Sequence, residues 1–190
     1  MHRHLRAGTG LAAAALLAAT GCSDAGERHT QGTQGAGLTT YRGAGFTVGH
    51  PRGWRPPARR IFPGANFEVV PPGPAGAPPR ASLSVFTERD RRPLHRIVDG
   101  LVALGRTSAD FRLIERRATE VGDRPAYVVR RGYSAAARDG RRVHLRQVDL
   151  LVRLSATAVI DVRVVATADR YEADRPSIDA VLRSFRSGTG

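Results

Sequence analysis

Four consecutive segments between residues 111 and 166 have the residue alternation of β-strands, and short turns separate them. These segments are residues 111–121, 126–133, 142–154 and 160–166. Asp139-Gly140 lies between the second and the third, and this pair readily adopts the positive φ angles of a tight hairpin. In the third segment the apolar phase changes after Leu145, which predicts a bulge near Arg146-Gln147. Neighbouring strands joined by short turns predict an antiparallel meander.

Two further segments have the apolar spacing of amphipathic helices. The first has one apolar stripe, formed by Leu94, Ile97, Val98, Leu101 and Val102. The second spans residues 170–184 and directs Ile178, Val181, Leu182 and Phe185 inward. Shorter strand patterns cover residues 46–48, 67–70 and 81–87, whereas residues 55–63 and the Pro-rich residues 71–79 are expected to be irregular. We therefore expect an α+β domain, in which an antiparallel sheet of about six strands is covered on one face by two main helices.

Residues 1–22 have the three parts of a bacterial export signal. Basic residues come first, an apolar run follows over residues 11–19, and Thr20-Gly21 precede Cys22, the only cysteine. The run is about half of the roughly 20 residues that a membrane-spanning helix needs. Ala19 stands where lipoprotein signals usually have leucine, so an ordinary secretory signal is the alternative. We expect Cys22 to carry a lipid and to hold the mature protein on the extracytoplasmic face of the cell membrane.

The composition of residues 23–37 predicts a flexible tether, because they are rich in Gly, Thr and Gln and contain no large apolar residue. A single domain is expected over residues 38–186, and the lone cysteine excludes an internal disulfide. All 30 basic residues are arginine, and the net charge of +13 falls to +11 when residues 1–22 are removed with Arg3 and Arg6. The arginines are dispersed and few aromatic residues lie among them, so we expect no nucleic-acid partner. We interpret the surplus as a codon-driven surface, with attraction to anionic envelope polymers or lipids as the alternative.

Three short motifs, in this order along the chain, resemble those of PsbP-like and LpqN-like lipoprotein domains. They are Phe46–Trp54 (FTVGHPRGW), Gly122–Ala126 (GDRPA) and Ile178–Phe185 (IDAVLRSF). The resemblance covers roughly residues 38–186, and the Pro-rich residues 55–79 depart from it. It implies an α/β sandwich with a twisted antiparallel sheet, no cofactor, and an accessory or binding role without enzyme activity. Because a shared fold does not carry function with it, the ligand or partner is left open.

The sequence contains no recognised catalytic or metal-binding motif. The histidines of the mature chain, His29, His50, His95 and His144, lack metal-ligand spacing, so we expect no metal site. Gly43-Ala44-Gly45 resembles a phosphate loop only superficially, because no helix pattern follows it.

Asp149 and Asp161 lie on neighbouring predicted strands and offer a carboxylate pair for acid–base chemistry. Arg146, Arg153 and Arg163 are close in sequence, which favours ion pairs on a solvent-exposed face instead. Trp54 is either a stacking platform for a ligand or a residue that closes the core, and we favour the core.

The expected function is therefore that of a lipid-anchored, non-catalytic binding or assembly module. The alternatives are an envelope hydrolase whose site is assembled from distant residues, and a charge-driven binder of anionic envelope polymers or lipids. A deep pocket lined by convergent polar groups would favour a ligand-binding or enzymatic role.

Overall fold

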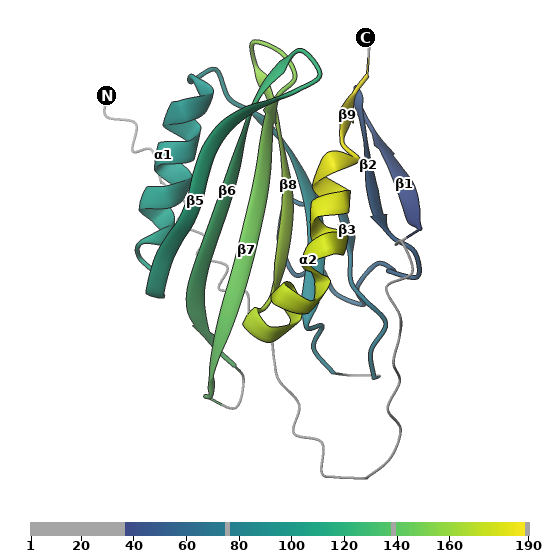
Figure 1. Cartoon of the computed structure of the whole chain (residues 1–190), viewed down its shortest axis with the longest axis vertical. Coiled ribbons are helices and arrows are strands. Elements are labelled where there is room, and N and C mark those ends of the chain that lie inside the picture. The colour runs from purple at the N-terminus through teal and green to yellow at the C-terminus, as the bar shows by residue number, and fades with distance from the viewer. Residues whose placement is uncertain (1–36, 75–76, 138–139, 189–190) are drawn as a thin grey trace, which may run out of the picture.

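The computed structural model describes residues 37–74, 77–137 and 140–188 and contains two antiparallel sheets and two helices. The elements follow one another as β1 (Leu38–Gly43), β2 (Phe46–Pro51), β3 (Phe67–Val69), β4 (Ala81–Arg89), α1 (Leu94–Gly105), β5 (Ala109–Val121), β6 (Arg124–Ala136), β7 (Arg142–Arg153), β8 (Ala158–Thr167), α2 (Ala168–Arg183) and β9 (Arg186–Ser187) (Figure 1). A six-stranded sheet has the order β3-β4-β8-β7-β6-β5, and a three-stranded sheet has the order β1-β2-β9. The α+β class and the meander of β5 to β8 are confirmed. Cys22, the signal expected over residues 1–22 and all but the last residue of the tether expected over residues 23–37 lie outside the described residues.

The expected bulge near Arg146-Gln147 is wrong. The pairing of β7 with β6 runs without interruption from Ala126↔Val152 to Ala136↔Arg142, and β7 also pairs continuously with β8. The two register shifts of the large sheet occur in β5 instead. The apolar phase of β7 changes because both faces of the strand are buried, so that Leu145 faces one side and Val148 the other.

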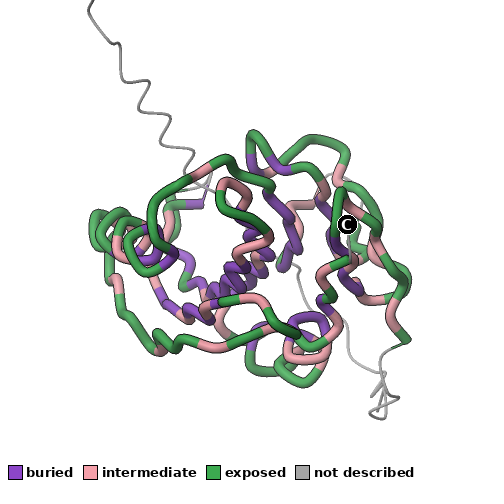
Figure 2. The backbone as a smooth tube through the Cα atoms, turned by 90° about the horizontal axis from the view of Figure 1, so that it is seen from above, coloured by how far each residue is buried: buried purple, intermediate pink, exposed green. Residues whose placement is uncertain are grey.

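The two helices cover opposite faces of the large sheet, which corrects the expectation that both lie on one face. Leu150 packs in the cluster that contains Ile178, Val181 and Leu182 of α2, whereas the adjacent Leu151 packs with Ile97 and Val98 of α1. Successive residues of a strand point to opposite faces, so the two helices are on opposite sides. Figure 2 shows the buried residues gathered along the strands in the middle of the molecule.

The small sheet lies on the α2 side and contributes to the same core. Gly43-Ala44-Gly45 forms the β1–β2 hairpin turn, with Gly45 at a φ of 76°, which confirms that no helix follows it. Phe46 of β2 stacks on Phe185, with ring centroids 5.6 Å apart. The main chain of β9 pairs with β2 immediately after Phe185, so the end of α2 is held against the small sheet.

Residues 55–66 have no regular strand or helix, as the sequence indicates, but they are part of the fold. Phe62 and Ala65 pack on the α1 side of the large sheet, beside Phe86 and Val165. The Glu68 carboxylate accepts hydrogen bonds from the main-chain N–H groups of residues 61 and 62, at 2.9 and 3.2 Å. This segment therefore covers the part of that face that α1 leaves open.

Candidate functional site

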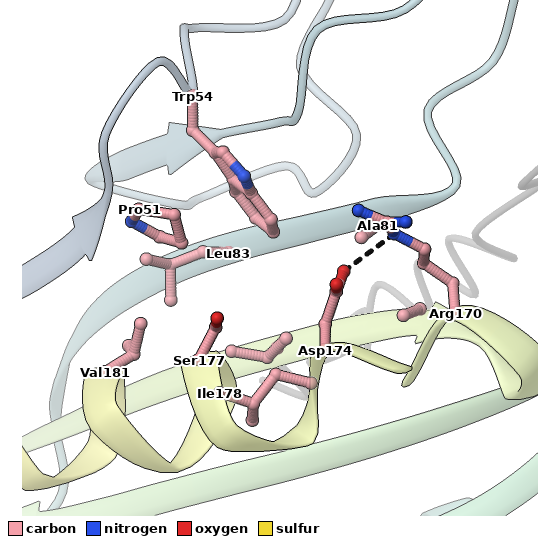
Figure 3. A pocket seen from close by; sticks show the side chains of 11 residues that line it. Pro51, Trp54, Ala81, Leu83, Arg170, Asp174, Ser177, Ile178 and Val181 are labelled. Atoms are coloured by element: carbon pink, nitrogen blue, oxygen red, sulfur yellow. Dashed lines mark ion pairs between the residues drawn. The ribbon is translucent and has the colours of Figure 1, made fainter. Parts of the chain in front are cut away.

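A cavity of about 160 Å³ lies between α2, strands β4 and β8, and the residues that follow β2 (Figure 3). Its apolar lining consists of Pro51, Trp54, Ala81, Leu83, Val164, Ala166, Ile178 and Val181. Its polar lining consists of Arg170, Asp174 and Ser177, all from α2. The α2 residues of this lining recur at helical spacing, so one side of the helix forms one wall of the cavity.

Trp54 is held at the cavity by the turn that precedes it. Gly53 adopts a φ of 84°, a conformation that favours glycine, and the N–H of Trp54 donates to the carbonyl of Pro51 at 3.2 Å. The indole is half-buried and packs against the main core cluster while it also lines the cavity. The ring therefore packs on the core and also forms a wall of the cavity, and its role as a stacking platform for a ligand stays a prediction.

The polar lining contains an ion pair within α2. Nε of Arg170 lies 2.7 Å from Oδ2 of Asp174, one helical turn away, and Asp174 is the more buried partner. Ser177 follows on the next turn. An apolar cavity of about 150 Å³ can hold a benzene molecule. The geometry therefore suits one aromatic or aliphatic group, with a polar neighbour at the arginine and the carboxylate.

Asp149 and Asp161 are not on a solvent face. Asp149 is 0% exposed and Asp161 is 4% exposed, and both bind the guanidinium of Arg163, at 2.8 and 2.5 Å. Arg131 approaches Asp149 at 3.5 Å, and the guanidinium of Arg163 lies 4.6 Å from the centre of the Phe86 ring. The expected ion pairing is present, but it is buried. Among the described residues the partners of these carboxylates are Arg163 and Arg131, and not Arg146 or Arg153.

The pKa of Asp161 is raised to about 7, because burial disfavours the carboxylate and the neighbouring Asp149 adds repulsion that Arg163 only partly offsets. A raised carboxyl pKa can mark an acid–base catalyst. Here, however, the three residues do not line the cavity beside Trp54. They are buried in the sheet, and the guanidinium of Arg163 lies over the rings of Phe62 and Phe86. The arrangement is that of a structural ion-pair network within the sheet.

A serine, a histidine and an aspartate meet at another place, which the sequence did not indicate. The hydroxyl of Ser134 donates to Oδ2 of Asp110 at 2.7 Å and lies 2.9 Å from Nδ1 of His144. This bond helps to lower the pKa of Asp110. With its proton directed to the aspartate, the Ser134 hydroxyl is arranged differently from the serine of a hydrolase, whose proton goes to the histidine.

The remaining histidines are not brought together. His50 lies against the ring of Phe67, with centroids 5.3 Å apart, His95 is exposed on α1, and His29 lies outside the described residues. Within the described ranges, no group of three or more His, Cys, Asp or Glu residues could hold a metal ion. The helices of that part of the chain include none long and apolar enough to cross a membrane.

No family model matches the chain, and no curated protein matches it either. Several solved structures share its fold. CyanoP, the cyanobacterial PsbP of Synechocystis, has a TM-score of 0.56 and 16% identity, over 82% of this chain and 95% of CyanoP. LpqN of Mycobacterium tuberculosis, involved in cell envelope biogenesis, has a TM-score of 0.54 and 12% identity, over 83% of this chain and 87% of LpqN.

The Ran-binding protein Mog1p of Saccharomyces cerevisiae has a TM-score of 0.51 and 12% identity, over 80% of this chain and 96% of Mog1p. These identities show the fold alone. The PsbP-like and LpqN-like fold expected from the three motifs is thereby confirmed, and it is also the fold of Mog1p.

Proposed function

We propose that this chain is a lipoprotein anchored at the extracytoplasmic face of the membrane, and that its domain binds a ligand or partner without catalysing a reaction. The cavity beside Trp54 carries the proposal, because a preformed apolar cavity with a few polar groups at its wall is the usual form of a recognition site. Two proteins of the same fold support it, since one is described as Ran-binding and the other as involved in cell envelope biogenesis.

The cavity selects for one apolar group attached to a polar one. Trp54 offers an aromatic face, and Leu83 and Ile178 offer aliphatic contacts. Arg170 and Asp174 present a positive and a negative group next to them, which suits an amide or a hydroxyl better than a single full charge. The anchoring of one aromatic or aliphatic group in such a cavity supplies much of the energy of many protein interfaces.

The hydrolase alternative has less support. Among the described residues, the serine that contacts a histidine is Ser134, and its hydroxyl donates to Asp110. The buried carboxylates Asp149 and Asp161 are separated from the cavity. The cavity beside Trp54 itself presents one serine, Ser177, and no histidine among its lining residues.

Trp54 makes the proposal testable, because it is the only tryptophan in the chain. Its fluorescence therefore reports on the cavity that it lines. We expect the emission of the purified full chain to change saturably when 1-hexanol, an apolar chain with one hydroxyl, is added. Ala166→Leu places three more carbon atoms at the lining and should weaken the response at least tenfold, because the ligand and the new side chain compete for the same volume.

The matched control is Ala103→Leu, which adds the same atoms to an exposed position of α1 on the other side of the sheet. It should leave the hexanol titration unchanged. A linear, unsaturable response in the parent protein, or equal responses in the two variants, would contradict the proposed site.

A further inference from the structure

Helix α2 separates two hollows on its face of the large sheet. The cavity described above lies on the side of Arg170 and Asp174. A smaller one, of about 70 Å³, lies on the side of Tyr171, Glu172 and Arg175 and reaches β6 and β7. We call this second hollow the arginine groove, since Arg130, Arg131, Arg146 and Arg175 are among its lining residues. Whether this groove binds a ligand does not depend on the function proposed for the cavity beside Trp54.

Arg146 is accommodated in the groove by a glycine. Gly132 lies within β6 directly opposite Arg146, so the two residues share one face of the sheet. A Cβ atom on Gly132 would come within 2.4 Å of Nη1 of Arg146. The guanidinium therefore lies across the strand where only glycine leaves room. Glycine weakens a strand interior and often marks a place of close approach, and here it leaves the space that the guanidinium of Arg146 occupies.

Among the described residues, the guanidinium of Arg146 has no ion pair, although Glu172 lines the same groove. No carboxylate or other acceptor among the described residues bonds to its guanidinium, although the residue is half-buried. Within the described ranges, Arg175 pairs with Glu172 alone, at 3.9 Å and with both side chains well exposed. Arg112 lies directly opposite Gly132 on β5, and the described part of the chain gives it no acidic partner either.

Arg130, in contrast, is fully engaged and fixes the groove. It binds Glu115 and Asp179 at 2.8 Å each and donates to the hydroxyl of Tyr171 at 2.6 Å. These contacts tie α2 to β5 and β6, because the three partners come from the helix and from β5. The Tyr171 hydroxyl accepts the bond from Arg130, so its own proton is left to donate into the groove.

We propose that the arginine groove binds a phosphate group, with Arg146 and Arg175 as its charged ligands and the Tyr171 hydroxyl as a third donor. Guanidinium groups match phosphate oxygens in pairs, and charge-assisted bonds of this kind are the strong ones. The volume equals that of about two water molecules, which admits a single tetrahedral anion and not a nucleoside. Arg131 and Gln147 also line the groove but direct their polar ends to Asp149 on the other face of the sheet.

The test uses three variants of the full chain. One moves the guanidinium of Arg146 without changing the net charge, and the other two each remove one positive charge. Gly132→Ala keeps the net charge and displaces only the flexible end of Arg146, so it should fold normally. We expect it to weaken the binding of inorganic phosphate, measured by calorimetry at constant ionic strength, by about tenfold. Arg146→Gln should do the same. Arg96→Gln removes an equal charge from the exposed side of α1 and should bind phosphate as the parent does.

A second set of titrations shows whether the groove binds a free phosphate ion or the phosphate of a lipid headgroup. Monomeric dihexanoyl phosphatidylglycerol replaces inorganic phosphate in the same titrations. Binding of both probes indicates a site for any phosphate, and binding of the lipid alone indicates a headgroup site. In either case the affinity must fall in Gly132→Ala. If Gly132→Ala and Arg96→Gln bind both probes as the parent does, or if the parent binds neither, the proposal is overturned.

Discussion

Asp149, Asp161 and Arg163 place three charges in a layer of the sheet with almost no access to solvent. Removing charges from water is costly, and mutual attraction and hydrogen bonds recover only part of that cost. Gln147 contributes by donating from its amide to both oxygens of Asp149, at 2.8 and 3.1 Å. One oxygen of Asp161, Oδ1, has no hydrogen-bond partner in the described part of the chain. Asp161 is therefore the least compensated charge of the network.

The raised pKa of Asp161 predicts a specific pH dependence of stability. Its pKa is about 7 in the folded protein and near 4 in the unfolded chain, so the folded state binds more protons between these values. The contribution of Asp161 to the free energy of unfolding should consequently fall as pH rises from about 4 through about 7. Asp161→Asn removes this titration, so the stability of the variant relative to the parent should increase between pH 5 and pH 8, as urea midpoints would show.

Asp99→Asn is the control for this comparison, because Asp99 forms an exposed ion pair with Arg116. Its stability relative to the parent should change little over the same interval, since exposed pairs contribute about 1 kcal/mol or less. If the stability of Asp161→Asn relative to the parent is the same at pH 5 and pH 8, as expected for Asp99→Asn, Asp161 does not titrate in this range.

At the scale of elements, α1 and α2 make unequal contributions to the core. Leu182 of α2 is 9% exposed and belongs to the main cluster, whereas Leu101 of α1 is only partly buried at the edge of its own cluster. Leu182→Ala should therefore lower the free energy of unfolding by about 2–5 kcal/mol. Leu101→Ala should lower the free energy of unfolding by clearly less. Thermal or urea unfolding distinguishes the two, and an equal loss would contradict the packing described here.

The sequence patterns predicted most of the large sheet and both helices, because β6 to β8 and the helix stripes are long and regular. They did not predict which face each helix covers. Leu150 and Leu151 are adjacent and both buried, and a strand buried on both faces gives no sign of which helix lies where. The strand β1 was missed because none of its residues is fully buried, and β9 because it has only two residues.

The candidate sites were predictable in part. Trp54 was identified from the turn before it, but its cavity depends on Ala81 and Val164, small or apolar residues that any core contains. Arg170, Asp174 and Ser177 have helical spacing, and this signal was available in the sequence. The approach of Arg146 to Gly132 depends on the register of β6 and β7, which a sequence pattern does not provide.

At the scale of the whole molecule, attachment to the membrane depends on a residue outside the described ranges. If Cys22 carries the lipid, Cys22→Ser should move the protein from the membrane fraction to the medium, because lasting attachment needs two or more acyl chains or a second membrane contact. Immunoblots of fractionated cells would measure the change. Ser23→Ala, which alters the next residue and leaves the cysteine, is the control. Unchanged fractionation of Cys22→Ser would exclude the lipid anchor.

Helix α2 is a wall shared by two hollows, with Asp174 on one side and the adjacent Arg175 on the other. Arg130 clamps this helix to the sheet through Tyr171 and Asp179. Occupants of the two hollows would therefore be linked thermodynamically. An occupant of one that tilts or stiffens α2 changes the affinity of the other, and the second occupant changes the affinity of the first by the same factor. Such coupling would let the occupancy of one hollow alter the affinity of the other.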